Sequence, residues 1–145
     1  MSILLIDAIQ NTHKADAAFM ALLGLTPAAI PTDMIKRFTK GVEPEIVVTK
    51  ETVPHICQYI IPGQFTARNH LVFQGKFCID FYGKTGYEAK LLFQRSFELF
   101  HDRRIVQPGF HSFLCALVYD GDFATGISGV KGYKGIYDVD YIRMN

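Results

Sequence analysis

Two pairs of histidine and cysteine residues are the strongest candidates for metal chemistry in this sequence. His55 and Cys57 lie two residues apart, and His111 and Cys115 form the second pair. Imidazole nitrogen and thiolate sulfur are ligands that zinc prefers. Structural zinc sites usually gather their ligands on turns, whereas these four residues lie in apolar segments typical of strands, where cysteine is commonly buried. We therefore expect neither a metal site nor a cofactor.

The same residues could form a nucleophilic pair, in which a histidine activates a cysteine thiolate and Asp80 orients the imidazole. Catalytic cysteines lie in exposed, electropositive surroundings, and the apolar neighbours of Cys57 and Cys115 predict the opposite. Packed, unreactive thiols are the expected alternative. The sequence thus offers no catalytic and no cofactor-binding residues, and we expect that the chain is not an enzyme.

Glycines at three-residue spacing between Gly126 and Gly135 resemble a phosphate-binding loop in composition only. They precede a predicted strand, whereas a phosphate loop follows a strand and opens a helix whose N-terminus holds the anion. Asp120 and Asp122 flank a glycine as in a calcium loop, but the rest of the ligand series and its terminal glutamate are missing. We interpret both groups as parts of turns.

The segment from Leu71 to Arg104 has the clearest secondary-structure pattern in the chain. We therefore expect it to form the framework that positions the other residues. Up to Tyr82 the odd positions are apolar or glycine, and several even positions are polar, which predicts a strand with its odd face on a core. Thr85 and Glu88 then form a capping box that opens an amphipathic helix. The expected core residues are Phe73, Phe77, Ile79, Phe81, Leu92, Phe93, Phe97, Leu114, Leu117 and Tyr137.

The remaining segments predict a helical N-terminus and further strands. One N-terminal helix, broken near Asn11, ends before Gly24. Strands are expected over residues 45–49, 53–61, 110–119 and 133–142, and the third should be central because it is apolar on both faces. Loops over residues 63–70 and 120–131 connect strands, and we expect both to be mobile until a neighbour orders them. The expected fold is α+β, one domain over residues 1–145 with a mostly antiparallel β-sheet packed against the amphipathic helix.

The composition excludes several classes of protein. With 145 residues, 49% hydrophobic and 20% charged, the chain is typical of a globular protein and unlike a disordered tail. A net charge of +1 argues against a dedicated nucleic-acid-binding protein. Three cysteines and an N-terminus without a basic region before its apolar residues predict reduced thiols in the cytoplasm. No apolar run approaches the roughly 18 residues of a membrane span, so we expect no membrane partner.

The chain resembles the tail terminator proteins of long-tailed bacteriophages. The resemblance lies in the order of the predicted elements, mainly after residue 44, and in three segments: VTKETVPHICQYIIPG, FCIDFYGKTGYEAKLLFQRSFELF and YKGIYDVDYI. It implies a structural virion protein that assembles in the bacterial host cytoplasm and forms a homo-oligomeric ring, hexameric in that family, at the junction of tail and neck. Such a ring caps the tail tube, ends tail polymerisation and provides the surface for head–tail joining.

The resemblance also implies the partners of the chain. These are further copies of itself, the tail tube protein and a head-closure or neck connector protein, while DNA passes through the ring without sequence-specific binding. The family has no catalytic residues to transfer. We expect partner contacts at Arg68, Asp122, Lys131 and Lys134, with the alternative that these side chains are merely solvated.

Three alternatives remain open at this point. The chain could be another neck or tail-tube subunit, such as a head-closure protein, because these share the same outline. It could be a small ligand-binding α+β domain or enzyme with a pocket between the sheet and the Tyr87–Arg104 helix. It could also be a nucleic-acid-binding module, whose basic residues would be Lys36, Arg37, Lys40, Lys131 and Lys134.

Overall fold

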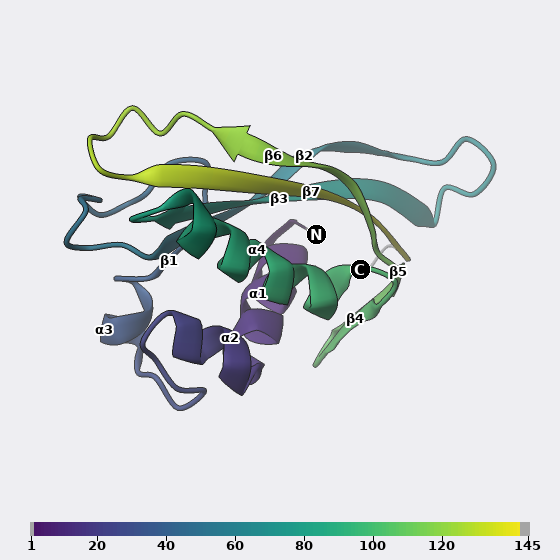
Figure 1. The fold of residues 1–145 in the computed structure, drawn as a ribbon. Helices are drawn as coiled ribbons and strands as arrows, with labels where there is room; N and C mark the ends of the chain where they lie inside the picture. The colour runs from purple at the N-terminus through teal and green to yellow at the C-terminus, as the bar shows by residue number, and fades with distance from the viewer. Residues whose placement is uncertain (1, 143–145) are drawn as a thin grey trace.

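The computed structural model describes residues 2–142, which place a layer of helices against one face of a curved sheet (Figure 1). The helices are α1 (Ser2–Ala15), α2 (Ala17–Leu22), α3 (Pro31–Met34) and α4 (Gly86–Phe100). The strands are β1 (Phe38–Thr39), β2 (His55–Phe65), β3 (Val72–Gly83), β4 (Arg104–Gln107), β5 (Phe110–Leu114), β6 (Ala116–Phe123) and β7 (Lys131–Ile142). This is the expected α+β fold with a helical N-terminus.

The strands form one sheet in the order β1-β2-β3-β7-β5-β4, and β6 also pairs with β7. Only β1 and β2 run parallel, and all other pairs are antiparallel. The long strand β3 lies between β2 and β7, with Phe77 opposite Ile60 on one side and Tyr137 on the other. The predicted alternation of β3 is confirmed, since its odd residues face the helices and its even residues face away.

Asp16 separates the first two helices. Its Oδ2 accepts a hydrogen bond from the backbone N–H of Phe19 at 2.8 Å, which caps α2. Arg95 of α4 donates to both carboxylate oxygens, from Nε at 2.8 Å and from Nη2 at 2.7 Å. These bonds from Arg95 are the main reason why the pKa of Asp16 lies below its usual value. The N-terminal helix therefore breaks at Asp16, and the predicted break near Asn11 was wrong.

The capping box that opens α4 is confirmed. Thr85 Oγ1 accepts from the backbone N–H of Glu88 at 3.1 Å, and Glu88 Oε2 accepts from the backbone N–H of Lys84 at 3.0 Å. The helix ends at Phe100, one turn before the predicted end at Arg104. The residues after Phe100 turn away to meet the strand segment that follows.

The predicted central strand over residues 110–119 is instead two strands at the side of the sheet. The chain bends at Cys115, whose N–H donates to Arg103 O at 2.8 Å and whose carbonyl accepts from Asp102 N–H at 2.9 Å. Because the segment after α4 takes these backbone groups, Cys115 cannot continue the ladder with β7. The segment carries apolar residues on both of its faces, but only one face is covered. Leu114, which we expected in the core, is 58% exposed.

The β-branched run over residues 45–49 forms no strand. Thr49 instead begins a turn, in which its N–H donates to Thr52 Oγ1 at 2.7 Å and its carbonyl accepts from Thr52 N–H at 3.0 Å. Val48 is buried, whereas Val47 is 80% exposed. Hydrogen bonds between Thr49 and Thr52 thus take the place of strand pairing, and the buried Val48 holds the loop against the protein.

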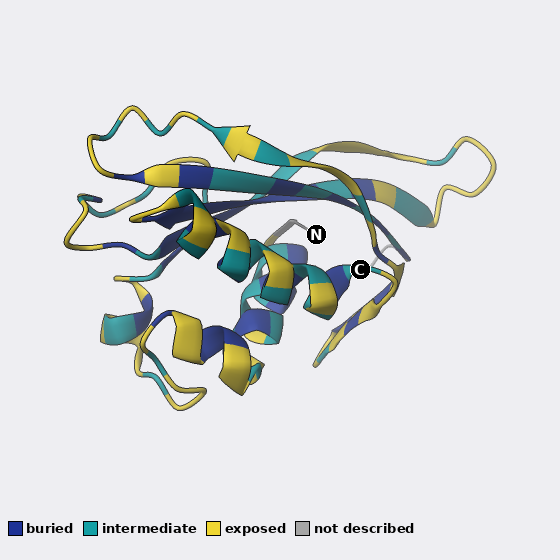
Figure 2. Cartoon of the chain, viewed as in Figure 1, coloured by how far each residue is buried: buried dark blue, intermediate teal, exposed yellow. Residues whose placement is uncertain are grey.

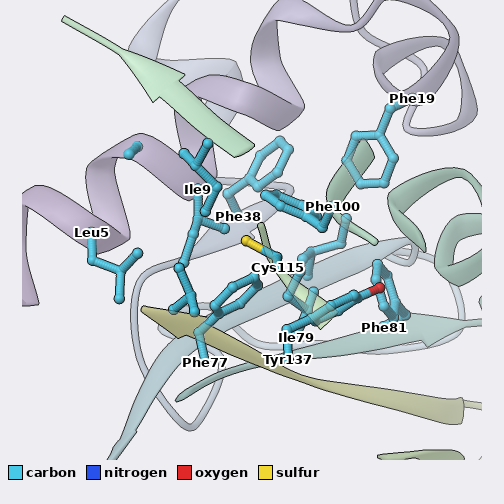
Figure 3. Close-up of a cluster of buried hydrophobic side chains, with 14 of the residues drawn as sticks. Leu5, Ile9, Phe19, Phe38, Phe77, Ile79, Phe81, Phe100, Cys115 and Tyr137 are labelled. Atoms are coloured by element: carbon cyan, nitrogen blue, oxygen red, sulfur yellow. The ribbon is translucent and has the colours of Figure 1, made fainter. Parts of the chain in front are cut away.

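The main core lies between the sheet and the helices (Figure 3). Five of the expected core residues are buried there, namely Phe77, Ile79, Phe81, Leu92 and Tyr137. Four are half-buried, namely Phe73, Phe93, Phe97 and Leu117. The sequence interpretation missed the contribution of the N-terminal helices, whose Leu5, Ile9, Phe19 and Met20 are also fully buried.

One polar network crosses this core. His13 of α1 is fully buried; its Nδ1 donates to Gln58 Oε1 of β2 at 2.8 Å, and its Nε2 accepts from Ser96 Oγ of α4 at 2.9 Å. Gln58 in turn donates from its amide to Gln10 at 3.4 Å, which leaves Oε1 for the imidazole. Burial lowers the pKa of His13 to about 4, so the ring is neutral and its tautomer is set by its two partners.

The opposite face of the sheet is covered only at one end. Loops over residues 41–54 and 124–130 pack there on Cys57 and Tyr82, with Val48, Val53 and Val130 as the buried apolar contacts. The rest of this face carries no helix from the described part of the chain, and we call it the open face. In Figure 2 the helical side of the sheet is lined by buried residues, and the loops and the upper strand are mostly exposed.

Candidate assembly surfaces

The sheet has two ends with different chemistry. The turn between β2 and β3 lies at one end, and the turn between β6 and β7 lies at the other, because Val72 pairs with Ile142 and Gly83 pairs with Lys131. The two residue pairs lie at opposite ends of β3, which is roughly 35 Å long at the rise per residue of a strand. A surface at one end therefore cannot contact the same neighbour as a surface at the other end, unless that neighbour spans the subunit.

The β2–β3 hairpin projects beyond the helices (Figure 1). Its turn is closed by hydrogen bonds: Thr66 Oγ1 donates to Asn69 O at 2.6 Å and accepts from Asn69 N–H at 2.8 Å. Asn69 Oδ1 also accepts from Leu71 N–H at 3.0 Å. The turn presents Arg68 to solvent, together with the apolar Leu71, which is 47% exposed. This end of the sheet is thus a shaped projection with one cation at its tip.

A row of aromatic rings stiffens the hairpin. Phe65 meets Phe73 edge to face with ring centroids 5.1 Å apart, and Phe73 contacts Tyr141 at 5.4 Å. A Cβ at Gly63 would lie 2.4 Å from the Gln74 carbonyl oxygen and 2.9 Å from the Phe73 ring, so only glycine fits at the bulge beside this row. Phe65 remains 42% exposed at the outer end.

The other end of the sheet carries the 124–130 loop. This loop is shorter than expected, because β6 continues to Phe123. Thr125 Oγ1 donates to Val130 O at 2.8 Å and accepts from Ile127 N–H at 3.2 Å. Lys131 follows directly and is exposed. The loop is therefore folded on itself and anchored on the second apolar cluster through Val130.

The four expected contact residues do not form one patch. Arg68 lies at the hairpin end, whereas Asp122 and Lys131 lie at the opposite end. Asp122 is exposed, and its carboxylate lies 3.7 Å from the ammonium group of Lys90 on α4. Whether these residues contact partners stays a prediction. Their arrangement divides them between the two ends of the subunit.

Lys134 differs from the other three because its charge is used inside the subunit. Its ammonium group lies 3.7 Å from Asp80 Oδ1 and donates to the Tyr59 hydroxyl at 3.2 Å. The Phe123 ring lies beneath the same ammonium at 5.4 Å. Asp80 is only 4% exposed, and burial raises the pKa of its carboxyl. Cys78 donates its S–H to Asp80 at 3.4 Å, which completes the cluster.

The histidine and cysteine residues that were candidates for metal or nucleophilic chemistry pack within the subunit without forming a group of metal ligands. His55 is buried, with Nε2 2.7 Å from Thr39 Oγ1 and Nδ1 3.0 Å from the Lys36 carbonyl oxygen. Cys57 and Cys115 are fully buried, and burial raises their pKa values to about 12 and about 11. Within residues 2–142 no group of three or more histidine, cysteine or acidic side chains is placed to hold a metal ion.

The space that a ligand-binding domain would use is filled with side chains. Between the sheet and α4, Phe93 contacts Tyr133 at 4.8 Å and Phe81 at 6.2 Å, and Phe100 contacts Phe77 at 5.3 Å. A groove of about 540 Å³ lies instead on the surface at the base of the hairpin. Its charged lining residues are Lys76, Asp138 and Asp140, and Lys76 forms an ion pair with Asp138.

The basic residues of the nucleic-acid alternative are dispersed and mostly engaged. Arg37 donates to the carbonyl oxygens of Thr52 and Pro54, both at 3.0 Å. Lys40 forms an ion pair with Asp7 at 2.5 Å. Lys131 lies on a different element from both. These cations do not line one groove that could follow a phosphate backbone.

No helix within residues 2–142 is long and apolar enough to cross a membrane.

The sequence matches no family model and no curated protein. The structure, in contrast, is similar to a chain in the virion of a native gene transfer agent particle, with a TM-score of 0.64 and 12% sequence identity. The match covers 96% of this chain and 95% of that chain. At such low identity the similarity concerns the fold, and it extends over nearly every helix and strand described above. The chain thus has the fold of a protein found in a gene transfer agent virion.

Proposed function

We propose that this chain is a structural protein of a phage-like virion and acts as the tail terminator. In this proposal it forms a ring, six-membered as in the proteins that its sequence resembles, at the junction of tail and neck. The ring caps the tail tube, ends its polymerisation and provides the surface to which the head binds. The observation that carries the proposal is the similarity in fold to a chain of a gene transfer agent virion, over almost the full length of both chains.

The two unlike ends of the sheet support this role. A terminator must match the growing end of the tube on one side and present a different surface on the other. The hairpin end carries Arg68 and exposed apolar groups, whereas the opposite end carries the 124–130 loop and Lys131. We assign one end to the tail tube protein and the other to a head-closure protein.

Passage of DNA through such a ring requires weak attraction to phosphate. The charges on the open face are arranged in pairs: Lys76 with Asp138, and Lys134 with Asp80. Asp140 adds a further negative group on the same face. Tight, counterion-releasing contacts need unpaired cations, which this face does not supply within the described residues. The proposal therefore includes passage of DNA without sequence-specific binding.

Deletion of the gene, followed by electron microscopy of the particles, tests the role. Loss of a terminator leaves overlong tails that lack heads. Loss of a tube subunit abolishes tails, and loss of a head-closure protein leaves tails of normal length that are not joined. Normal infectious particles would refute any structural role. Complementation with Arg68→Glu and, separately, Lys131→Glu then assigns the two ends, since each should impair either tail capping or head joining.

A further inference from the structure

Besides the short strand β4, the sheet has two lateral edges that lack strand partners within the described residues. On one side β6 is the last strand, and its apolar Val118 and Tyr119 are about half exposed, 49% and 55%. On the other side β1 pairs only with Ile56 and Cys57, which leaves Gln58–Phe65 of β2 without a strand neighbour. Unpaired edges of this kind are templates for another strand.

The directions of the strands make the two edges compatible. β2 is antiparallel to β3, β3 to β7, and β7 to β6, so β6 runs opposite to β2. A second copy that is rotated about an axis along the strands keeps the same strand directions. Its β2 therefore meets β6 of the first copy in the antiparallel sense, which has the straighter hydrogen bonds. Such a contact joins two different surfaces, as a closed ring of more than two copies requires.

The charges favour this contact over pairing of like edges. β6 carries Asp120 and Asp122 and no cation. Two β6 strands side by side would bring these carboxylates together, which destabilises a strand pair. The β1–β2 edge is flanked by Lys36, Arg37 and Lys40, of which Lys36 lies 4.0 Å from Asp33 and Lys40 forms an ion pair with Asp7. Two β6 edges would thus repel each other, whereas β2 carries no acidic residue that would repel β6.

The rows of the sheet align these charges. Asp122 lies on the row of Tyr133, Phe81 and Ile56, and Ile56 is the residue that pairs with Phe38 of β1. Without a shift along the strands, the acidic end of β6 in one copy therefore arrives beside β1 and its flanking cations in the next. The first residue of β6, Ala116, lies on the row of Ile61 at the free part of β2.

We propose that copies of this chain associate through their sheet edges, β6 of one copy lying antiparallel to the β1–β2 edge of the next. The partner is a second copy, and the contact combines backbone pairing with attraction between Asp120 or Asp122 and the Lys36–Lys40 segment. This inference rests on the proposed function for its ring, but the edge contact can be tested apart from it. Pro62 has no N–H to donate, so the backbone pairing is centred before it.

Cross-linking of single-cysteine substitutions tests the contact directly. Ala116→Cys and Ile61→Cys lie on one row of the sheet, at opposite edges. The native Cys57, Cys78 and Cys115 can stay, because all three are buried. Val106→Cys, 57% exposed on β4 and away from both edges, is the control for random collisions. The purified variants are treated with a short bismaleimide over a series of concentrations up to the solubility limit.

The expected result is a cross-linked dimer when the Ala116→Cys and Ile61→Cys proteins are mixed, and none from either protein alone. A chain that carries both substitutions should give a ladder of multimers. Dimers from Ala116→Cys alone would show β6 against β6 and overturn the proposal. It is equally overturned if the mixture yields no more dimer than the Val106→Cys control at the highest concentration.

Charge reversal provides the second test. Asp120→Lys combined with Asp122→Lys should weaken self-association about tenfold, as measured by sedimentation. Lys36→Glu combined with Lys40→Glu should restore it in the same chain. Restoration by Arg103→Glu with Arg104→Glu, at the start of β4, would argue for a general charge effect and against the edge contact. Successful cross-linking with normal tails after gene deletion would leave the contact standing and the terminator role refuted.

Discussion

The ring of Phe77 on β3 stacks on the ring of Tyr137 on β7, with centroids 5.1 Å apart and planes inclined by only 14°. Both side chains are fully buried, and the edge of Phe100 from α4 closes the group at 5.3 Å from Phe77. The pair therefore joins the two longest strands to the longest helix. It is the place where the sheet and the helical layer are locked together.

Truncation of this pair should be costly. We expect Phe77→Ala to lower the free energy of unfolding by about 3–5 kcal/mol, because a buried ring is lost and a cavity remains. Phe65→Ala is the matched control, since Phe65 lies on the exposed hairpin at 42% accessibility and should cost less than about 1 kcal/mol. Urea unfolding of both variants checks the prediction. Equal losses would show that Phe77 is not a core residue.

The buried imidazole of His13 should make stability fall in mild acid. The unfolded chain binds a proton near the usual histidine pKa of about 6.5, whereas the folded chain binds it only near pH 4. Stability from this group is thus fully present above pH 6.5 and is lost as the pH falls toward 4. Between pH 6.5 and 5 the expected loss is about 2 kcal/mol.

His13→Gln isolates this contribution from that of His55, whose pKa burial also lowers. The variant should be less stable than the natural chain at pH 7, but its stability should change less between pH 6.5 and 5. Urea titrations at both pH values give the comparison. Parallel losses in the two proteins would assign the pH dependence to groups other than His13.

Removal of the Lys134 charge should leave a buried carboxylate without its cation. We expect Lys134→Met to cost about 1–3 kcal/mol at pH 7. Because burial already raises the pKa of Asp80 above its unfolded value, protonation favours the folded state, and the penalty should shrink as the pH falls. Lys134→Met combined with Asp80→Leu should recover part of the loss. A double variant that is as unstable as the sum of the singles would contradict the pairing.

Two substitutions at Asp16 separate its two roles. Asp16→Asn keeps an N-cap oxygen for Phe19 but loses the charge that Arg95 contacts, and it should cost about 0.5–1 kcal/mol. Asp16→Ala loses both and should cost about 1–2 kcal/mol. Thermal unfolding with calorimetry distinguishes them. If both changes cost the same, the cap contributes nothing measurable.

The elements that sequence alone predicted well are those whose signal is local. The alternation of β3 and the Thr85–Glu88 capping box involve residues within one turn or one pleat, and both are confirmed. The segment over residues 110–119 was misplaced because its apolar residues fit either a covered central strand or an exposed edge. What decides between them is the bond of Cys115 to Arg103, which depends on where α4 ends.

The candidate surfaces were predictable only as segments. The sequence indicated the hairpin turn and the loop before β7. It did not indicate the ion pair between Lys134 and Asp80, which are 54 residues apart in the sequence. The position of β6 at the edge of the sheet was missed because its apolar residues also fit a central strand. Its one local signal is the pair Asp120 and Asp122, which are unusual in a strand covered on both faces.

The bend at Cys115 makes the sheet edge and the helical layer one mechanical unit. β5 and β6 are consecutive in the chain but lie in different parts of the fold. β6 forms an edge of the sheet, whereas β5 is the second strand of a hairpin whose first strand, β4, packs on α1. The backbone bonds from Cys115 to residues 102 and 103 clamp this corner to the end of α4. A force that a neighbour applies to β6 is therefore passed through the Cys115 corner to the end of α4, as well as to β7.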